Sequence, residues 1–321
     1  MVPRGMRLSM LVARYDRNAA LLDGRVPIEG VDLEITEVND DNTRQRLGQS
    51  GAYDAWEAYT GRYLMDFDAG RHGFVAIPVF VKRNFRHSSI YVRCDAPRIS
   101  PADLGGGRIG IQHWSTTAAI WAKGILADDF GLDLHSVTWV QTSPDAFAWQ
   151  RPQWLRLEQA APGRDLAEML RAGEIDAAIS SSAWVPYEHP DLAFLLPDYR
   201  ELEREYFART RIFPIMHTLV VRTSLLDAEP TLGRLLFDAW TLAKQACLDR
   251  LERERLLGTS MWFAGLLEEE RLAVGERDIY PWGLRRSRHE IAKLVDYALD
   301  QGIVTVRHEP EALFHPSTWD T

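Results

Sequence analysis

A short basic segment carries the side chains best suited to chemistry on a small anion. Lys82, Arg83, Arg86 and His87 follow one another closely, directly before a strand-like run at 89–94. The whole chain is acidic, with a formal net charge of -9 at pH 7, so this basic cluster does not indicate nucleic-acid binding. Guanidinium groups bind carboxylates through paired hydrogen bonds, and an imidazole beside an anion can transfer protons near neutral pH. The segment therefore predicts a site for a small anionic ligand.

Arg83 and Arg86 are the candidate carboxylate-binding residues of this segment. On a strand, residues three apart point to opposite sides, so both can face one ligand only if the segment is a loop. We favour Arg86 for the site and expect one of the two arginines to form a surface or inter-lobe ion pair. Such an ion pair without any ligand is the alternative for either residue.

His87, His217 and Glu57 are the candidates for proton transfer. Histidine titrates near neutral pH, and Glu57 could accept a proton from a phenol. The alternatives are structural histidines bonded to backbone carbonyls and a salt-bridged glutamate. Together with His113 these residues offer nitrogen and oxygen donors for a metal, but no closely spaced pair such as His-x-x-x-His supports such a site. We predict no metal and no cofactor.

Hydroxyl and aromatic side chains gather at the start of a predicted helix. Ser115, Thr116 and Thr117 open this helix, where hydroxyls and free backbone N–H groups can bind an anion. Simple capping of the helix without a ligand is the alternative. His113 and Trp114 precede them, and an aromatic ring here could stack on a substrate ring or pack in the core.

Alternating strand-like and helix-like segments predict an α/β fold. The strand-like segments are 7–13, 31–38, 74–81, 89–94, 108–111, 175–179 and 218–222. Helical periodicity marks 116–130, 165–172, the part from 231 onward, and 288–302, which Ser287 and Glu290 introduce with capping-box spacing. Ser180 and Ser181 follow one of the strands, where their hydroxyls could contact a ligand or only form a turn.

The chain length of 321 residues exceeds one typical domain. We predict a discontinuous first lobe, residues 1–92 plus 221–321, and an inserted second lobe, residues 93–220. The chain would cross between the lobes around Tyr91 and Val220. Ligands of such folds bind near the carboxyl ends of strands, so His87 and His217, each beside a crossing, would lie near the cleft.

Composition restricts the class of protein further. Apolar residues make up 46% and charged residues 26% of the chain, as in soluble globular proteins. No run approaches the roughly 18 apolar residues of a membrane helix, and the N-terminus lacks the apolar core of a secretory signal. We expect a cytoplasmic protein without membrane or nucleic-acid partners. The sequence Val2-Pro3-Arg4-Gly5 before Met6 looks like a protease-site remnant, which leaves open a replaced signal peptide.

Several longer phrases resemble the 4,5-dihydroxyphthalate decarboxylase family. The specific ones are Arg83-Asn84-Phe85-Arg86-His87-Ser88 and Phe213-Pro214-Ile215-Met216-His217. Further resembling phrases are Tyr280-Pro281-Trp282-Gly283 and Leu313-Phe314-His315-Pro316-Ser317-Thr318. They span nearly the whole chain in the family's order. The resemblance implies a two-lobed type II periplasmic-binding-protein-like fold with two inter-lobe crossings, and non-oxidative decarboxylation of a hydroxylated aromatic acid without an organic cofactor.

The resemblance also bears on individual residues. Glu57 matches a family glutamate, and Trp282 lies in a matching phrase. Two segments depart from the family pattern: the residues after Glu57, which include Tyr59, and the segment 112–116. Both should face the cleft, so the reaction class carries over better than the substrate, and Tyr59 becomes a candidate for substrate contact.

Decarboxylation of an electron-rich ring needs a general acid at the ring carbon, a partner for the phenol and clamps for the carboxylates. We expect His87 or His217 to donate the proton, Glu57 to tune the phenol, and Arg86 with the helix start at 115–117 to hold a carboxylate. A solute-binding protein for a small aromatic or carboxylate ligand is the alternative, as is another enzyme on the same scaffold. A homo-oligomer is left open.

Overall fold

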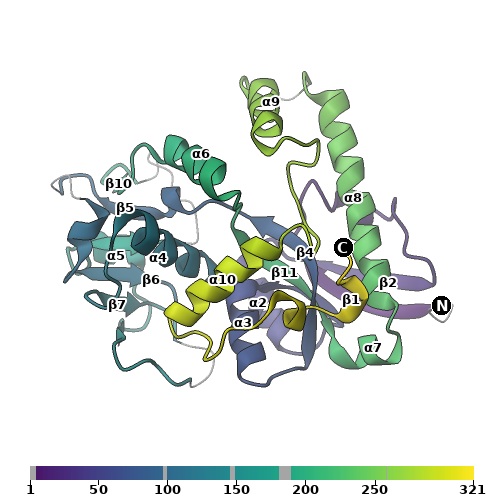
Figure 1. Cartoon of the computed structure of the whole chain (residues 1–321), viewed down its shortest axis with the longest axis horizontal. Helices are drawn as coiled ribbons and strands as arrows, with labels where there is room; N and C mark the ends of the chain where they lie inside the picture. The colour runs from purple at the N-terminus through teal and green to yellow at the C-terminus, as the bar shows by residue number, and fades with distance from the viewer. Residues whose placement is uncertain (1–4, 97–99, 145–148, 181–188, 258) are drawn as a thin grey trace.

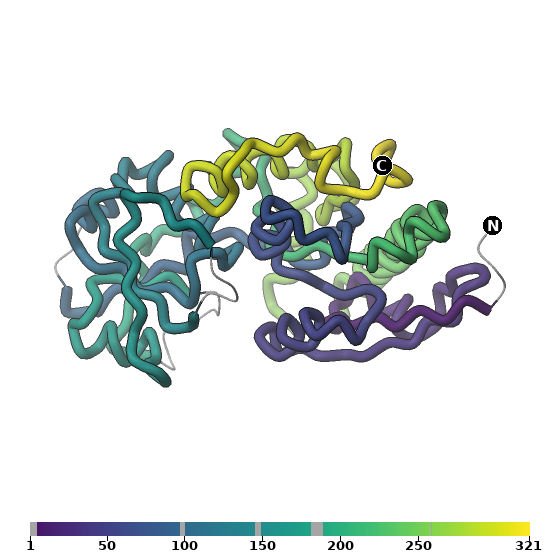
Figure 2. Tube along the Cα trace, turned by 90° about the horizontal axis from the view of Figure 1, so that it is seen from below, coloured from purple at the N-terminus to yellow at the C-terminus, as the bar shows by residue number. Residues whose placement is uncertain are grey.

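The computed structural model describes residues 5–96, 100–144, 149–180, 189–257 and 259–321, and these form two lobes. Each lobe is built around one β-sheet with helices packed on it (Figure 1). Seen from below, the lobes lie side by side along the longest axis, and the C-terminal part of the chain extends from one to the other (Figure 2). The predicted two-lobed α/β architecture is confirmed.

The sheet of the first lobe has the strand order β2-β1-β3-β11-β4. Its strands are β1 (Met6–Val12), β2 (Val31–Glu37), β3 (Ala55–Tyr59), β4 (Phe74–Arg83) and β11 (Ile215–Arg222). The strand β1 pairs in parallel with β2 and β3, whereas β11 runs antiparallel to β3 and β4. Every residue of β3 is buried, as expected for an inner strand covered on both faces. Helices of this lobe are α1 (Ala19–Leu22), α2 (Asp41–Gln49), α3 (Thr60–Asp68), α7 (Thr223–Ala228) and α8 (Leu232–Glu254).

The sheet of the second lobe has the order β10-β5-β9-β6-β7-β8. Its strands are β5 (Ile90–Arg93), β6 (Arg108–Ile111), β7 (Thr138–Gln141), β8 (Arg156–Gln159), β9 (Ala177–Ile179) and β10 (Leu192–Phe194). They are accompanied by α4 (Thr117–Phe130), α5 (Leu166–Arg171), α6 (Tyr199–Thr210) and the 3-10 helix η2 (Pro101–Leu104). The first ten residues of α4 are all buried, because this helix packs against β9 on one side and against helices of the first lobe on the other.

Sheet membership locates the two crossings between the lobes. The strand β4 belongs to the first sheet and β5 to the second, so the chain crosses at 84–89, which includes the 3-10 helix η1 (His87–Ser89). It returns between β10 and β11, through α6. The expected crossing points, Tyr91 and Val220, therefore lie inside sheets, because β5 pairs with β9 and β10 while β11 pairs with β3 and β4.

The C-terminal part adds α9 (Phe263–Val274), α10 (Arg288–Asp300), η3 (Pro310–Leu313) and η4 (Pro316–Thr318). The helix α10 contacts both α3 and α4, so it joins the two lobes. It begins at the predicted place, but the capping-box bonds are not those expected. Ser287 Oγ accepts a hydrogen bond from Arg83, and Glu290 accepts from Arg83 and from the backbone N–H of Phe213. Long-range partners have replaced the local ones.

The lobes touch where α3 and α4 begin. The backbone N–H of Gly61 donates to Thr117 Oγ1 over 2.9 Å. A Cβ atom at position 61 would lie 2.5 Å from the carbonyl oxygen of Ser115 and from Ile120 Cδ1. This close approach requires glycine.

Candidate active site

One row of residues across the first sheet forms the base of the site. Register places Tyr59 of β3 opposite His217 of β11, and His217 opposite Lys82 of β4. Directly opposed residues share one face of a sheet, so these three side chains are neighbours. The pairing of β4 with β11 is irregular on both sides of His217. Pro78, in the irregular part of β4, has no N–H group to continue the ladder, and such bulges re-aim side chains near active sites.

Glu57 and His217 form a buried pair within this face. His217 Nδ1 lies 2.5 Å from Glu57 Oε1, and both side chains are almost completely buried. The second carboxylate oxygen, Oε2, accepts from the backbone N–H of Ala13, and Oε1 also accepts from Tyr15 Oη at 2.7 Å and Arg44 Nη2 at 3.0 Å. These bonds fix the carboxylate toward His217. Its burial does not fit the expected role of Glu57 as a direct acceptor of a phenol proton.

The charges around this pair decide where its proton lies. Burial alone would raise the pKa of Glu57, but its bond to His217 and the charges of His217 and Arg44 hold the pKa below its usual value. Burial lowers the pKa of His217, and Glu57 opposes that effect only in part. The free site thus contains an ionised Glu57 and a neutral His217. Because a carboxylate only accepts hydrogen bonds, Nδ1 carries the hydrogen and Nε2 keeps its lone pair.

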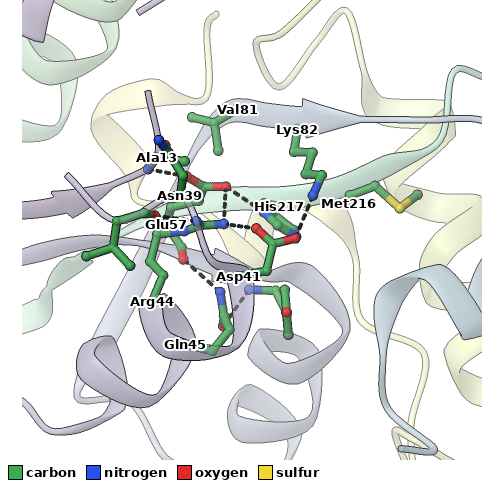
Figure 3. A network of polar contacts seen from close by, with 12 residues as sticks. Ala13, Asn39, Asp41, Arg44, Gln45, Glu57, Val81, Lys82, Met216 and His217 are labelled. Atoms are coloured by element: carbon green, nitrogen blue, oxygen red, sulfur yellow. Dashed lines mark hydrogen bonds and ion pairs between the residues drawn. The ribbon is translucent and has the colours of Figure 1, made fainter. Parts of the chain in front are cut away.

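Asp41, Arg44 and Lys82 extend the pair into a charged network (Figure 3). Arg44 donates to both Asp41 and Glu57, and Lys82 Nζ lies 2.5 Å from Asp41 Oδ2. Although burial opposes ionisation, the nearby charges of His217 and Lys82 lower the pKa of Asp41 to about 2. The side chains of Lys82 and Asp41 are 28% and 29% exposed, whereas those of Arg44 and Glu57 are fully buried. A ligand would therefore reach the network at the Asp41–Lys82 ion pair.

Asp41, Glu57 and His217 also form a possible donor set for a metal. Their ligand atoms lie within 4.8 Å of one another, and such nitrogen and oxygen donors suit several divalent ions. However, Arg44 bonds both carboxylates, and Lys82 bonds Asp41. Two cations already balance the two carboxylates, so these residues do not fit a resident metal ion.

A pocket of about 140 Å³ lies beside the network, where the lobes meet. The first lobe contributes Asn42, Gln45, Arg46, Gln49, Tyr59 and Arg62, and the second contributes His113, Ser115 and Thr116. The Tyr59 ring connects the pocket to the buried pair, with its centroid 4.8 Å from that of His217. Of the residues predicted from the sequence, the structure thus brings Tyr59, His113, Ser115 and Thr116 together in one pocket.

The start of α4 presents hydrogen-bond donors on the second-lobe side of this pocket. Thr116 occupies the N-cap position, yet its side chain makes no capping bond, and its buried Oγ1 has no partner among the described residues. The alternative of simple capping therefore does not hold for Thr116. Thr117 Oγ1 instead accepts from Gly61 of the other lobe. A helix start with an unpartnered hydroxyl is suited to binding an anion.

Arg86 is a buried cation without a carboxylate partner. It is 4% exposed, and its Nε lies 3.1 Å from the sulfur of Met216, the neighbour of His217. No ion pair joins Arg86 to a described residue, and burial lowers its pKa to about 10. An unpaired buried guanidinium is costly unless an anion compensates it. Among the candidate clamps, this arginine has the charge available for a ligand.

Arg83 has a structural position instead. It pairs with Glu290 at 2.8 Å and donates to Ser287 Oγ and the carbonyl oxygen of Phe213. Its whole side chain is buried in this arrangement. Arg83 thus forms an ion pair, as expected for one of the two arginines, but the pair is buried and not at the surface. The proposed role of Arg83 in substrate binding does not fit its contacts.

The remaining predicted residues lie outside the pocket. Trp114 and Trp282 are buried, and their indole nitrogens donate to the carbonyl oxygen of Gln301 and to Thr241 Oγ1. Trp114 therefore packs in the core, the second of the two alternatives, and Trp282 does the same. Ser180 is buried beside the first crossing, where its backbone N–H donates to Ser89. Ser181 lies outside the described residues.

His87 sits in the first crossing, in aromatic surroundings. Its ring lies 5.3 Å from that of Tyr206 and 6.5 Å from that of Phe130, measured between centroids. Burial, together with the charge of Arg209, lowers the pKa of His87 to about 4. Its Nδ1 is buried without a partner among the described residues. His87 is therefore neutral near pH 7 and separate from the network of His217.

Sequence reasoning missed Asp41 and Arg44, and it named Lys82 only as part of the basic segment. The short spacing of Lys82 to Arg86 was the one available signal for the lysine. Asp41 and Arg44 lie on a polar helix whose pattern resembles any solvated surface helix. Their role arises from the packing of α2 over the ends of β1 and β3.

A two-lobed α/β scaffold with a charged site at the meeting of the lobes defines the periplasmic-binding-protein-like class. Similar solved structures include the alkanesulfonate-binding protein SsuA from Xanthomonas axonopodis pv. citri, at 16% identity and a TM-score of 0.54, covering 99% of both chains. The desulfurization enzyme DSZB is 16% identical, with a TM-score of 0.53 and 98% coverage of both chains. A Candida albicans protein with the generic periplasmic binding protein fold is 11% identical, with a TM-score of 0.55, over 97% of this chain and 95% of that one. At these identities the likeness establishes the fold alone.

Sequence similarity defines the family. No protein-family model matches the chain. A 4,5-dihydroxyphthalate decarboxylase from Comamonas testosteroni is 31% identical over 325 residues, which cover 98% of each chain. One from Pseudomonas putida is 34% identical over 201 residues, covering 60% of this chain and 78% of that protein. The chain belongs to the 4,5-dihydroxyphthalate decarboxylase family, which confirms the resemblance seen in its sequence.

None of the helices in the described part of the chain has both the length and the hydropathy needed to span a bilayer.

Proposed function

We propose that this protein removes a carboxyl group from a hydroxylated aromatic carboxylic acid, with 4,5-dihydroxyphthalate or a close analogue as the substrate. The single observation that carries the proposal is the buried Glu57–His217 pair, which the Tyr59 ring connects to the pocket between the lobes. Membership of the family supports the reaction class. Arg46, Arg62 and His113 line the pocket itself. His217 and Arg86 offer a buried imidazole and a buried guanidinium near Asp41.

The chemistry requires one proton at one carbon atom. Direct loss of carbon dioxide would leave an aryl carbanion, which is a poor intermediate. If the ring carbon bearing the carboxylate is protonated first, the C–C bond breaks and its electrons restore the aromatic ring. A hydroxyl group ortho or para to that carbon supplies electron density for the protonation. One proton is consumed and one molecule of carbon dioxide leaves for each product formed.

His217 is the proposed general acid. The imidazole is neutral in the free site, but an arriving dianion adds negative charge beside it and favours the imidazolium form. Glu57 stabilises that form through the bond to Nδ1, so Nε2 can take up a proton from solvent and deliver it to the ring carbon. Glu57 acts as a positioning residue for the imidazole rather than as a contact of the substrate.

The polar groups around the pocket would orient the ring. Arg86 would hold one carboxylate, and the start of α4 with Thr116 would offer hydrogen-bond donors to the other. Asp41, the partly exposed acceptor of the network, would accept a hydrogen bond from a ring hydroxyl while Lys82 keeps it ionised. Such a hydrogen bond increases the electron density of the ring at the carbon to be protonated.

The test is turnover by the purified protein. The protein is mixed with 4,5-dihydroxyphthalate, with monohydroxylated benzoic and phthalic acids, and with phthalate as the control without a hydroxyl group, and carbon dioxide release is followed. We expect turnover of hydroxylated acids and none of phthalate. Absence of turnover with every hydroxylated acid would refute the enzyme proposal.

A solute-binding protein is the second candidate, because a pocket between two lobes and an uncompensated Arg86 would also bind an anion without chemistry. Calorimetry distinguishes the two functions. Tight binding of a hydroxylated phthalate with quantitative recovery of the unchanged acid would favour the binding protein.

A further inference from the structure

The pocket between the lobes has a lining of one charge sign. Arg46, Arg62 and His113 contribute to it, and none of the described residues that line it is acidic. The chain as a whole is acidic, with a formal net charge of -9. Basic side chains gathered around a pocket of an acidic protein favour an anionic ligand at that place.

Arg46 is the arginine of this lining whose charge is available to a ligand. It is exposed and forms no hydrogen bond or ion pair with another described residue. Arg62 differs, because its Nε donates to Asp66 Oδ2 over 2.9 Å. Asn42, Arg46 and Gln49 follow one another at helical spacing on α2, so they share one face of that helix, and all three line the pocket.

The start of α4 lines the same pocket from the second lobe. Thr116, at the N-cap position of this 14-residue helix, is 5% exposed, and its Oγ1 has no partner among the described residues. The first backbone N–H groups of a helix also carry partial positive charge. A carboxylate has two oxygen atoms, so one can accept from Arg46 while the other accepts from the helix start. The two lobes thus offer donors to a single carboxylate.

The proposed reaction also needs a way to stop after one carboxyl group. Decarboxylation of 4,5-dihydroxyphthalate consumes one proton, releases one molecule of carbon dioxide and leaves 3,4-dihydroxybenzoate. This product still has a carboxylate para to a hydroxyl group, so it is open to the same ring protonation. A site that also binds the second carboxylate separates the two acids, because the product can fill only one of two anion positions.

We propose that Arg46 determines specificity for aromatic dicarboxylates: together with the start of α4, it binds the carboxylate that stays on the ring. This inference rests on the proposed function, because it assigns a position to one group of the same substrate. Arg86, which lies beside Met216, holds the other carboxylate. Loss of Arg46 therefore weakens the binding of a dicarboxylate, whereas a monocarboxylate at Arg86 is unaffected.

The experiment measures the binding of phthalate and of benzoate to the full chain by calorimetry at one fixed ionic strength. Neither acid has a hydroxyl group, so binding is measured without turnover. The wild-type protein should bind phthalate about tenfold or more tighter than benzoate, as expected for a hydrogen bond to a charged group. Arg46→Gln should remove most of this preference and leave the Kd of benzoate unchanged. Arg46→Lys keeps the charge but not the paired donors, so it should retain part of the preference.

Arg7→Gln is the matched control. It removes the same charge at the start of β1, from a side chain that is 87% exposed and does not line the pocket. Both dissociation constants should stay at their wild-type values in this variant. Circular dichroism verifies that all variants are folded.

Three outcomes would overturn the assignment of Arg46. They are a wild-type protein that binds phthalate no tighter than benzoate, an Arg46→Gln protein that keeps the preference for phthalate, and an equal loss of affinity for both acids, which would indicate a general attraction of anions. The reaction is judged separately, by carbon dioxide release. A preference for phthalate without turnover of any hydroxylated acid would refute the reaction and leave the carboxylate site. Turnover of 4,5-dihydroxyphthalate by Arg46→Gln with an unchanged KM would refute the site and leave the reaction.

Discussion

Replacement of Glu57 by glutamine separates the charge of the buried pair from its shape. Glutamine keeps a side-chain oxygen that can accept from His217 Nδ1, but it removes the negative charge next to the imidazole. Because Glu57 is fully buried and lies 2.5 Å from Nδ1, solvent does not screen the interaction. The variant therefore tests whether Glu57 stabilises the protonated form of His217, as the proposed mechanism requires.

The magnitude follows from the bond that is lost. A hydrogen bond to a charged group contributes about 1.5–3 kcal/mol to the stability of the ionised form. Loss of this contribution lowers the pKa of His217 further, so the imidazolium is less populated at neutral pH. The resulting free-energy change corresponds to about a 10- to 100-fold decrease in kcat. The melting temperature should fall as well, because Arg44 loses one of its two carboxylate partners and removal of one partner of a buried charge pair is destabilising.

The assay is kcat for carbon dioxide release as a function of pH, at saturating substrate and below the melting temperature. A general acid is active when protonated, so kcat falls as pH rises through the pKa of His217 in the complex. In Glu57→Gln this descending limb should move to lower pH, and lower pH should recover part of the activity. Tyr15→Phe is the control, because it removes one hydrogen bond to Glu57 Oε1 without changing the charge. Its kcat should fall by only about 2- to 12-fold, from the roughly 0.5–1.5 kcal/mol of a neutral bond.

Two results would refute this reasoning. In one, a folded Glu57→Gln protein has the wild-type kcat. In the other, kcat falls by the same factor at every pH, which would indicate a structural effect rather than a loss of proton affinity at His217.

Three further predictions concern the same site. Arg86→Met should raise KM for a dicarboxylic substrate by about 30-fold or more, from the roughly 2–5 kcal/mol of a buried charge contact. The melting temperature of the free protein should rise, because an unpaired buried charge is gone. A lower melting temperature with unchanged KM would contradict this prediction. His217→Ala should reduce kcat by about a hundredfold or more and His87→Ala much less, and the reverse order would assign the general acid to His87. Asp41 has a pKa of about 2, below its ordinary value, so it stabilises the fold above about pH 4 by about 2 kcal/mol. This contribution is lost as pH falls toward 2. Urea unfolding of Asp41→Asn should therefore be less sensitive to pH across this range, and an unchanged pH dependence would contradict the assignment.

The fold could be predicted because its signals are local. Strand-like runs such as 108–111 and helices such as 116–130 have the right period and end at glycine or polar residues, and the structure contains both within a residue or two. The boundaries between the lobes were harder to predict from the sequence. Whether β5 belongs to one sheet or the other depends on its pairing with β9 and β10, and strand composition does not encode the partner.

The site was predictable only where chemistry and sequence position coincide. An arginine in a short basic segment indicated Arg86, but the same pattern also indicated Arg83, whose partner Glu290 lies 207 positions further along the chain. An aromatic residue before a helix start, such as Trp114, could stack on a substrate ring or pack in the core. Only the packing in the folded structure assigns Trp114 to the core. Asp41 acquires its role from three side chains that the fold brings from elsewhere, His217, Lys82 and Arg44.

The missing side chain at Gly61 has a mechanical consequence. Its backbone contacts Thr117 across the boundary between the lobes, and a methyl group there would collide with backbone as well as side-chain atoms. Gly61→Ala should therefore act as a steric spacer that holds the two halves apart without replacing any side chain that lines the pocket. Small-angle scattering would register a larger radius of gyration. Any drop in turnover that accompanies it would measure how strongly catalysis depends on the spacing of the halves rather than on the identity of the residues between them.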